Sequence, residues 1–126
     1  MLASCRATTI LPVVDADRAR DFYSRVLGLR DLGASADGKY LFELNGGLLA
    51  LLQKTEPTKA EHTALSFEVE DARSAIDDLT TRGVVFEDYD FPGLKTVNKV
   101  CILGSEKAAW FKDTEGNLLC VHEVIA

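Results

Sequence analysis

Two histidines and three cysteines are the residues of this 126-residue chain best suited to catalysis or metal binding. Cys120 and His122 lie two positions apart, and side chains at that spacing share one face of a strand. Together with His62 they would form a set of nitrogen and sulfur donors, which suits zinc. A thiol beside His62 would also be a candidate nucleophile, because an imidazole can lower the thiol pKa. The simpler interpretations are that the strand pair is a coincidence and that Cys120 is a small buried apolar residue.

Aromatic residues point to a second kind of chemistry, the stacking of a flat ligand. Tyr89, Phe91 and Trp110 are candidates to stack against such a ligand at the mouth of a cleft. Lys95, in the same stretch as the first two, could meet an anionic ligand, although most loop lysines are solvated. Glu123 lies one position from His122, so alternation places it on the opposite face from Cys120, and we interpret it as a solvated charge.

These residues must be positioned by a structural unit that occurs twice in the chain. Each copy reads as a strand, a helix opened by an aspartate and ended by a glycine, and further strands joined by a glycine-bearing turn. Asp15 and Asp71 open the two helices 56 positions apart, whereas Gly46 and Gly116 lie 70 positions apart, so the second copy carries about 14 extra residues. A repeated unit that cannot bury its apolar face alone packs against its twin or a partner chain.

In the first copy, the pattern predicts strands over 8–14, 29–32, 39–44 and 48–53 and a helix that begins near Asp15 or Asp17 and ends at Gly28. In the second copy it predicts strands over 63–69, 84–89, 108–112 and 118–125 and a helix between Asp71 and Gly83. The extra length falls near 88–99, a loop with a Pro-Gly turn, two aromatics and two lysines. Long loops in compact domains are more often functional lids than filler.

Composition narrows the classes of protein. The net charge of −6 and the scattered lysines and arginines argue against nucleic-acid binding, which needs a clustered basic surface. We find no apolar run long enough to cross a membrane and no signal-peptide core, so we expect a cytoplasmic protein. Three cysteines cannot all pair within one chain, and their spacing is not that of a zinc ribbon, so we expect free thiols.

Three segments together resemble the vicinal oxygen chelate superfamily, the glyoxalase, bleomycin-resistance and extradiol-dioxygenase group. They are DADRARDFYSRVLGL (15–29), HTALSFEV (62–69) and WFKDTEGN (110–117), in the order of that family. The resemblance implies an α+β fold in which two βαβββ modules form an incomplete barrel around a central cleft, usually in a homodimer. It gives a single domain over 1–126, with module one at 7–53, a linker at 54–61 and module two at 62–126.

The resemblance also implies where a divalent metal would be held, at up to four strand positions. Carried onto this chain, those positions fall at Thr8, near Ala50, at His62 and at Cys120. One imidazole and one thiol are a poor set for Mn, Ni, Fe or Mg, which need several oxygen or imidazole donors. We therefore expect no cofactor. If a metal is bound, the set His62, Cys120 and His122 is the one to hold it.

Two functions follow. The first is a small-molecule-binding protein similar to the metal-free, bleomycin-resistance-like branch, with a pocket that we expect to involve Thr8, Ala50, His62, Tyr89, Phe91, Trp110, Cys120 and His122. The alternative is a metal-dependent lyase, isomerase or dioxygenase with a rearranged site built on His62 and Cys120. A third interpretation is a partner-docking module that has lost its ligand. The sequence predicts no nucleic-acid or membrane partner.

Overall fold

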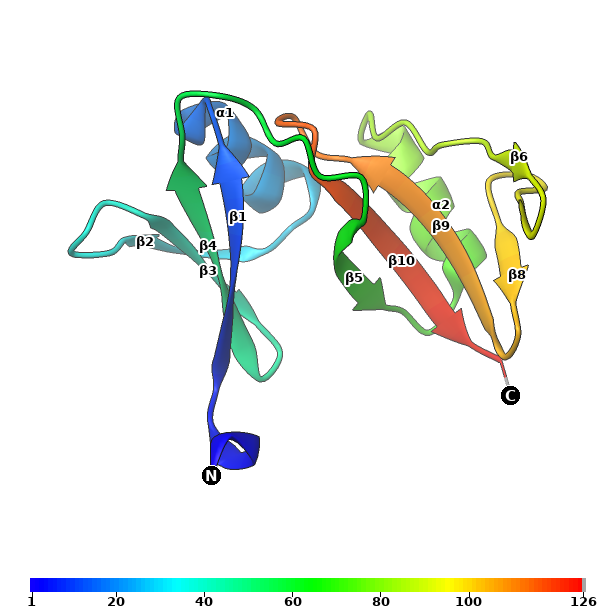
Figure 1. The fold of residues 1–126 in the computed structure, drawn as a ribbon, viewed down its shortest axis with the longest axis horizontal. Helices are drawn as coiled ribbons and strands as arrows, with labels where there is room; N and C mark the ends of the chain where they lie inside the picture. Colours follow the sequence, from blue (N-terminus) through cyan, green and yellow to red (C-terminus); the bar gives the residue numbers. More distant parts are fainter. Residues whose placement is uncertain (126) are drawn as a thin grey trace. The chain divides into compact units, whose positions relative to one another are not determined.

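The computed structural model describes residues 1–125, and within them the chain forms two compact units. The first unit contains residues 1–59 and the short segment 113–117. The second contains residues 60–112 and the chain from Leu118 onward. Both units consist of a four-stranded mixed sheet with a helix packed on it, so the predicted α+β class and the two βαβββ modules are confirmed (Figure 1).

The first unit contains the strands β1 (Ala7–Val13), β2 (Arg30–Ala34), β3 (Tyr40–Leu44) and β4 (Gly47–Gln53) in the order β1-β4-β3-β2. β1 runs parallel to β4, and the other pairs are antiparallel. The helix α1 (Ala16–Asp21) continues into one π-type turn, η2 (Phe22–Val26), and a short 3-10 helix, η1 (Leu2–Ser4), precedes β1. Alternation along the strands places their buried side chains on the helix side: Leu11, Val13, Phe42, Leu49 and Leu51.

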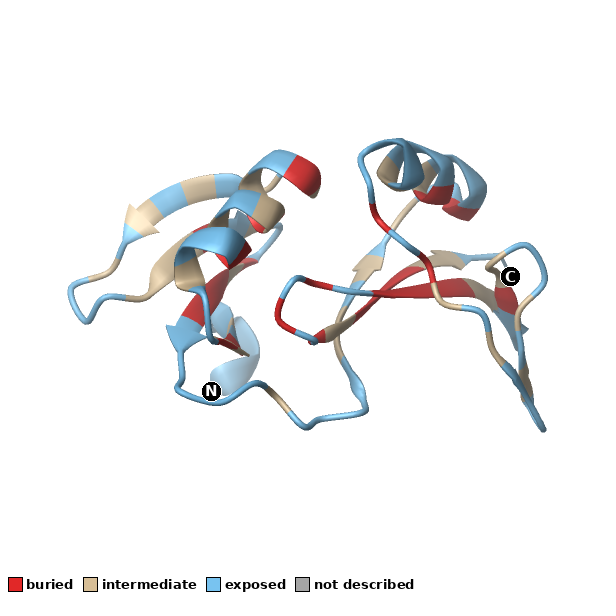
Figure 2. Ribbon diagram, turned by 90° about the horizontal axis from the view of Figure 1, so that it is seen from above, coloured by how far each residue is buried: buried red, intermediate tan, exposed pale blue. Residues whose placement is uncertain are grey.

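The second unit repeats this arrangement with β5 (Thr63–Glu68), α2 (Ala72–Thr81), β8 (Cys101–Leu103), β9 (Glu106–Lys112) and β10 (Leu118–Val124). The sheet order is β5-β10-β9-β8, and β5 runs parallel to β10. Figure 2 shows α2 lying over one face of β9 and β10. Ile76 of α2 and Phe111 and Leu119 of the sheet are buried on that side. The inserted loop carries a small hairpin of two-residue strands, β6 (Asp90–Phe91) and β7 (Leu94–Lys95).

Both helices begin as the sequence predicts. The side chain of Asp15 accepts a hydrogen bond from the amide of Arg18, and that of Asp71 accepts one from the amide of Ser74. Each carboxylate therefore satisfies a free amide of the first turn. The first helix differs from the prediction in its last turn, where the amide of Leu27 donates to the carbonyl of Phe22, the i to i+5 spacing of a π turn.

The predicted strand over 84–89 is wrong, because only one isolated bridge joins this segment to the sheet, between Phe86 and Phe111. The residues do alternate, with Val84 and Phe86 buried and Val85 80% exposed. However, its backbone bonding to β9 is limited to this bridge and the hydrogen bond from the Glu87 amide to the Trp110 carbonyl, whereas β8 pairs further along β9, at Glu106–Ala108. The segment is therefore extended and half-buried without being a ladder strand.

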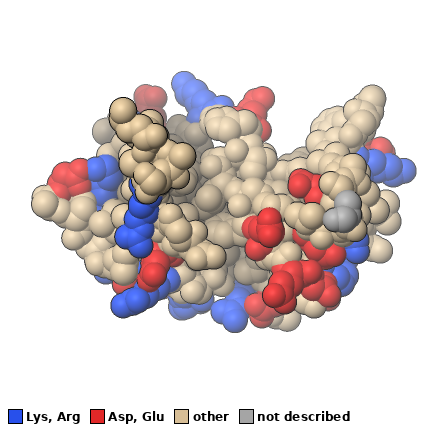
Figure 3. Space-filling view, turned by 90° about the horizontal axis from the view of Figure 1, so that it is seen from below, with Lys and Arg blue, Asp and Glu red and all other residues tan. Residues whose placement is uncertain are grey.

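The turn Asp113–Asn117 joins β9 to β10, yet it belongs to the first unit. The predicted module two (62–126) includes this turn, and its last residue, Ala126, lies outside the described residues. In the described part of the chain, no helix is long and apolar enough to cross a membrane. On the face shown in Figure 3, basic side chains are dispersed among acidic and uncharged ones, so the described residues gather no basic patch there.

Candidate functional site

The second unit contains a pocket of about 340 Å³ on the sheet face opposite α2. This volume lies within the range of small-molecule sites. The lining residues come from the start of β5, the inserted loop, and the facing ends of β9 and β10: Glu61, His62, Thr63, Tyr89, Leu94, Trp110 and Leu118. The pocket therefore combines an apolar and aromatic wall with a few polar groups.

Trp110 is the central wall of this pocket and is held in place from two sides. Its indole Nε1 donates a hydrogen bond of 3.1 Å to Thr63 Oγ1. The Tyr89 ring lies with its centroid 5.6 Å from that of Trp110, at an interplanar angle of 59°. Behind the indole, Cys101, Ala108 and Cys120 form a buried apolar cluster. These contacts fix the ring plane, so a flat ligand would meet an ordered surface.

The inserted loop supplies the other aromatic wall. Tyr89 and Thr96 hold its base together, because the amide of each donates to an oxygen atom of the other, at 2.9 Å in both cases. Phe91 follows on β6 with its ring 6.0 Å from that of Tyr89, and it is 60% exposed. Lys95 on the paired strand is exposed and is not among the lining residues.

Backbone strain accompanies the end of this loop. Asn98 and Lys99 both adopt positive φ, at 51° and 74°, and form the turn between Val97 and Val100. Lys99 forms an ion pair of 2.6 Å with Asp88. The Asn98 carbonyl accepts a hydrogen bond of 2.8 Å from Arg73 on α2. The loop is thus tied to the helix of its own unit.

The predicted pocket residues fall into three groups. His62, Tyr89 and Trp110 line the pocket, and Phe91 adjoins Tyr89. Cys120 belongs to the buried cluster behind Trp110, and His122 lies two residues further along β10. Thr8 and Ala50 belong to the first unit, on the face of its sheet opposite α1.

Burial dominates the surroundings of the Cys120 thiol. Its side chain is buried, and this burial is the largest influence on the thiol, raising its pKa above the ordinary value. A hydrogen bond from Ser66 acts in the opposite direction but does not reverse the shift. The other groups that act on the thiol pKa are Ala109, which lowers it, and Glu106, which raises it; His62 is not among them.

The residues at the implied metal positions do not fit a divalent metal. The Ala50 side chain has no donor atom, Thr8 offers a neutral hydroxyl, and Cys120 is a thiol whose pKa is raised by burial. His62 alone remains as a conventional ligand. Across residues 1–125, no group of three or more His, Cys, Asp or Glu side chains is placed to hold an ion.

Glu123 differs from its sequence interpretation. The structure does place it on the opposite face of β10 from Cys120, but it is half-buried, and its Oε1 accepts a hydrogen bond of 2.8 Å from the amide of Ala72. Glu123 thereby satisfies a free amide at the start of α2, where a negative charge is favoured.

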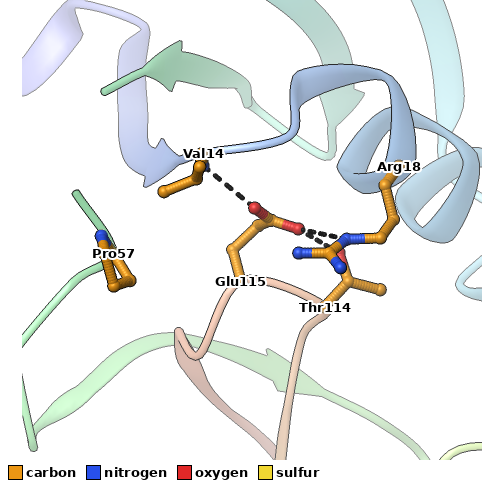
Figure 4. A pocket seen from close by; sticks show the side chains of 5 residues that line it. All are labelled: Val14, Arg18, Pro57, Thr114 and Glu115. Carbon is orange, nitrogen blue, oxygen red and sulfur yellow. Dashed lines mark hydrogen bonds and ion pairs between the residues drawn. The ribbon is translucent and has the colours of Figure 1, made fainter. Parts of the chain in front are cut away.

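A second pocket, of about 260 Å³, lies in the first unit, beside Val14, Arg18, Pro57, Thr114 and Glu115 (Figure 4). The Glu115 side chain is 1% exposed, and four groups donate to it. The amides of Val14 and Asp15 share Oε1, each at 2.9 Å, whereas Arg18 Nε at 3.0 Å and the Thr114 hydroxyl at 2.7 Å share Oε2.

Burial, the largest influence on Glu115, raises the pKa of its carboxyl group. The hydrogen bonds from Asp15, Arg18, Thr114 and Val14 together outweigh that effect and lower the pKa to about 2. Both carboxylate oxygens are already occupied by protein donors. We therefore regard Glu115 as a clamp that fixes the turn, not as a ligand-binding group.

Sequence reasoning missed this clamp and its buried neighbours. Tyr23 is fully buried, and its hydroxyl donates a hydrogen bond of 2.6 Å to Asp113. Asn117 donates to the carbonyl of Pro12 at 2.9 Å and to Asp113 at 2.9 Å. The segment WFKDTEGN carried the family resemblance, but nothing in its letters indicates which distant residues its side chains contact.

Comparisons with known proteins agree with this architecture. A family model described as the Glyoxalase/Bleomycin resistance protein/Dioxygenase superfamily matches residues 6–121. A search of curated proteins found no match. A solved member of the same superfamily from Sphaerobacter thermophilus is similar to this chain with a TM-score of 0.76 at 20% identity, covering 98% of this chain and 99% of its own.

Two further solved structures carry named activities. An antibiotic binding protein, TnmS3, from a Streptomyces species is similar with a TM-score of 0.67 and 19% identity, over 98% of both chains. A fosfomycin resistance protein from Listeria monocytogenes, complexed with Mn(II) and a dihydroxypropylphosphonic acid, is similar with a TM-score of 0.70 and 14% identity. That match covers 97% of this chain and 90% of the Listeria chain. At these identities the likeness concerns the fold.

Proposed function

Because this chain belongs to the glyoxalase/bleomycin resistance protein/dioxygenase superfamily, we propose that it binds a small molecule in the aromatic pocket of its second unit. The ligand we expect is flat and largely apolar, with polar substituents that face the rim formed by Glu61 and His62. Binding by shape and stacking needs no metal. The proposal thus corresponds to the metal-free, bleomycin-resistance-like branch of the superfamily.

The observation that carries this proposal is the ordered aromatic wall. Trp110 is fixed by Thr63 on one side and by Tyr89 on the other, and the pocket beside them has a volume of about 340 Å³. Aromatic side chains whose planes are already set lose little conformational freedom when a ligand stacks on them. The antibiotic binding protein TnmS3 has a similar fold, which supports a binding role for such a scaffold.

The absence of a cofactor is part of the proposal and rests on the donor set. A single exposed imidazole, His62, is too little to hold a divalent ion in an octahedral site. Metal analysis of protein purified without a chelator tests this point. We expect substoichiometric metal, whereas near-stoichiometric Mn, Ni, Fe or Zn would favour the alternative, a lyase, isomerase or dioxygenase that uses His62.

We also propose that the protein is a cytoplasmic homodimer. Ile10 is 52% exposed and Leu52 is 38% exposed, and both lie on the face of the first sheet opposite α1. An apolar sheet face of this kind is commonly covered by another protein surface. The three cysteines are free, as expected in a reducing compartment. Light scattering and sedimentation measure the oligomeric state directly.

Fluorescence titration tests the binding proposal, since Trp110 is the only tryptophan in the chain. A panel of planar heteroaromatic compounds should include ligands that quench its emission saturably. Tyr89→Leu removes one aromatic wall and keeps the reporter, so we expect Kd to rise about 3- to 10-fold, the range of one aromatic contact. Tyr40→Leu, in β3 of the first unit, is the matched control and should leave Kd unchanged. Equal weakening by the two variants would refute the assignment of the pocket.

A further inference from the structure

Three side chains on the face of the second sheet opposite α2 form a chain of contacts outside the pocket. Ser66 Oγ lies 2.6 Å from His122 Nδ1. On the other side of the same ring, Nε2 lies 3.8 Å from Glu68 Oε1. A hydroxyl, an imidazole and a carboxylate therefore follow one another in that order. None of the three lines the aromatic pocket.

Strand geometry accounts for this grouping. Ser66 and Glu68 lie two positions apart on β5, so their side chains share one face. β5 runs parallel to β10, and the register pairs Glu68 with His122 and Ser66 with Cys120. The imidazole consequently lies between the two side chains of the neighbouring strand. The regular backbone of both strands holds all three groups.

The exposure of each group suits a reaction with a molecule from solution. Ser66 is exposed, whereas the His122 side chain is only 20% exposed and Glu68 is 71% exposed. The Ser66 hydroxyl can donate to Nδ1, which makes this nitrogen the one placed to take the Ser66 proton, and the Glu68 carboxylate lies close enough to Nε2 to pair with a protonated ring. A nucleophile, a base in contact with it and a carboxylate near that base are components of a covalent acyl-transfer site.

We propose that Ser66, His122 and Glu68 form a second active site, which hydrolyses carboxylic esters through an acyl-serine. Ser66 Oγ attacks the ester carbonyl while its proton passes to His122 Nδ1. The alcohol leaves as the carbonyl re-forms, and it takes that proton. Water then attacks the acyl-serine with His122 again as the base, which releases the acid and restores the Ser66 hydroxyl. Glu68 stabilises the charged imidazolium in both steps.

The backbone and side chains around Ser66 supply hydrogen-bond donors for an oxyanion and an apolar contact for an acyl group. The amide of Val69 donates to the carbonyl of His122, so alternate amides along β5 face β10, and those of Ser66 and Glu68 face the other way. β5 is the edge strand of its sheet in the described part of the chain, so within that sheet these two amides face no strand and can donate to an oxyanion. Val124 is 55% exposed and lies on the same face of β10, two residues beyond His122. This apolar neighbour favours esters with a short aliphatic acyl group.

Active-site labelling of the full-length protein tests the proposal. With p-nitrophenyl butyrate we expect a burst of p-nitrophenolate close to one per chain, followed by slower turnover. A fluorophosphonate probe should add covalently to Ser66, as located by peptide mass mapping. Ser66→Ala should abolish the burst and the adduct. His122→Gln, which keeps the size and polarity of the side chain, should slow acylation by about 100-fold or more.

Two controls keep the result decisive. Ser105→Ala changes an exposed serine in the β8–β9 turn and should leave burst and labelling unchanged. Circular dichroism and Trp110 fluorescence verify that each variant is folded. Hydrolysis without a burst that persists in Ser66→Ala would reveal simple imidazole catalysis and overturn the proposal. A fluorophosphonate adduct at another residue, or no adduct in the folded wild-type protein, would overturn it as well.

Discussion

Replacing Glu115 by glutamine removes one charge from the clamp while keeping its size. In the folded protein the Glu115 pKa is about 2, against an ordinary value of 4.5. A difference of this size corresponds to about 3 kcal/mol in favour of the ionised carboxylate in the folded state. Because the side chain is 1% exposed, solvent screens little of that energy. We expect Glu115→Gln to lower the free energy of unfolding by about 3 kcal/mol at pH 7.

The pH dependence of the free energy of unfolding distinguishes the contribution of the Glu115 charge from that of its packing. Since the folded pKa is depressed, the contribution of Glu115 is fully present above the unfolded pKa of 4.5, declines as the pH falls, and is gone below about 2. Urea denaturation followed by circular dichroism should therefore show the wild type and Glu115→Gln converging between pH 5 and pH 2. Glu43→Gln is the matched control, because Glu43 forms an exposed ion pair with Arg30 and should change stability by less than about 0.5 kcal/mol.

The reasoning would be refuted by a difference below about 1 kcal/mol at pH 7, or by a larger difference that does not shrink as the solution is acidified. The first result would mean that the donors to Glu115 are replaced by water at little cost. The second would mean that packing of the side chain, not its charge, stabilises the turn.

Three further substitutions test individual contacts by urea denaturation. Gly47→Ala should lower the free energy of unfolding by about 1 to 3 kcal/mol, because the new Cβ would lie 2.6 Å from the carbonyl oxygen of Ala7. An unchanged denaturation midpoint would show that β1 shifts away from the new methyl group without loss of stability. Lys99→Gly should raise the free energy of unfolding by about 0.5 to 1 kcal/mol, because glycine adopts a φ of 74° without strain and only an exposed ion pair with Asp88 is lost. A loss of stability would show that the ion pair contributes more than the backbone strain costs. Tyr23→Phe should cost about 1.5 to 3 kcal/mol by removing a buried hydrogen bond to Asp113, and a neutral effect would contradict that bond.

The sequence predicts the elements whose signals are local. The caps formed by Asp15 and Asp71 are confirmed because an N-cap bond spans only three residues, so the cap and its partner stand together in the sequence. The same local alternation produced the error at 84–89. Alternation reports which residues are buried, but a ladder strand also needs successive backbone hydrogen bonds to a neighbouring strand, and this segment bridges β9 only at Phe86.

In the candidate site, too, the sequence predicts what depends on neighbouring residues but not the contacts between distant ones. The aromatic candidates Tyr89 and Trp110 lie together, as do the strand neighbours Cys120 and His122, but their role in binding stays a prediction. The clamp could not be predicted, since Glu115 and Val14 are about 100 positions apart and neither residue type indicates the other. Ser66 could not be predicted for a similar reason. A serine in a strand becomes a candidate nucleophile only when the register of the partner strand shows which side chain lies next to it.

The placement of the Asp113–Asn117 turn has a consequence for biosynthesis. A nascent chain that has reached residue 59 holds every strand of the first unit, but it lacks the acceptor for the amides of Val14 and Asp15. That acceptor is translated just before the final strand, so the N-terminal half emerges from the ribosome with exposed donors and must wait for the C-terminal half. Splitting the gene between the halves should therefore give an N-terminal fragment that depends on its complement to become stable.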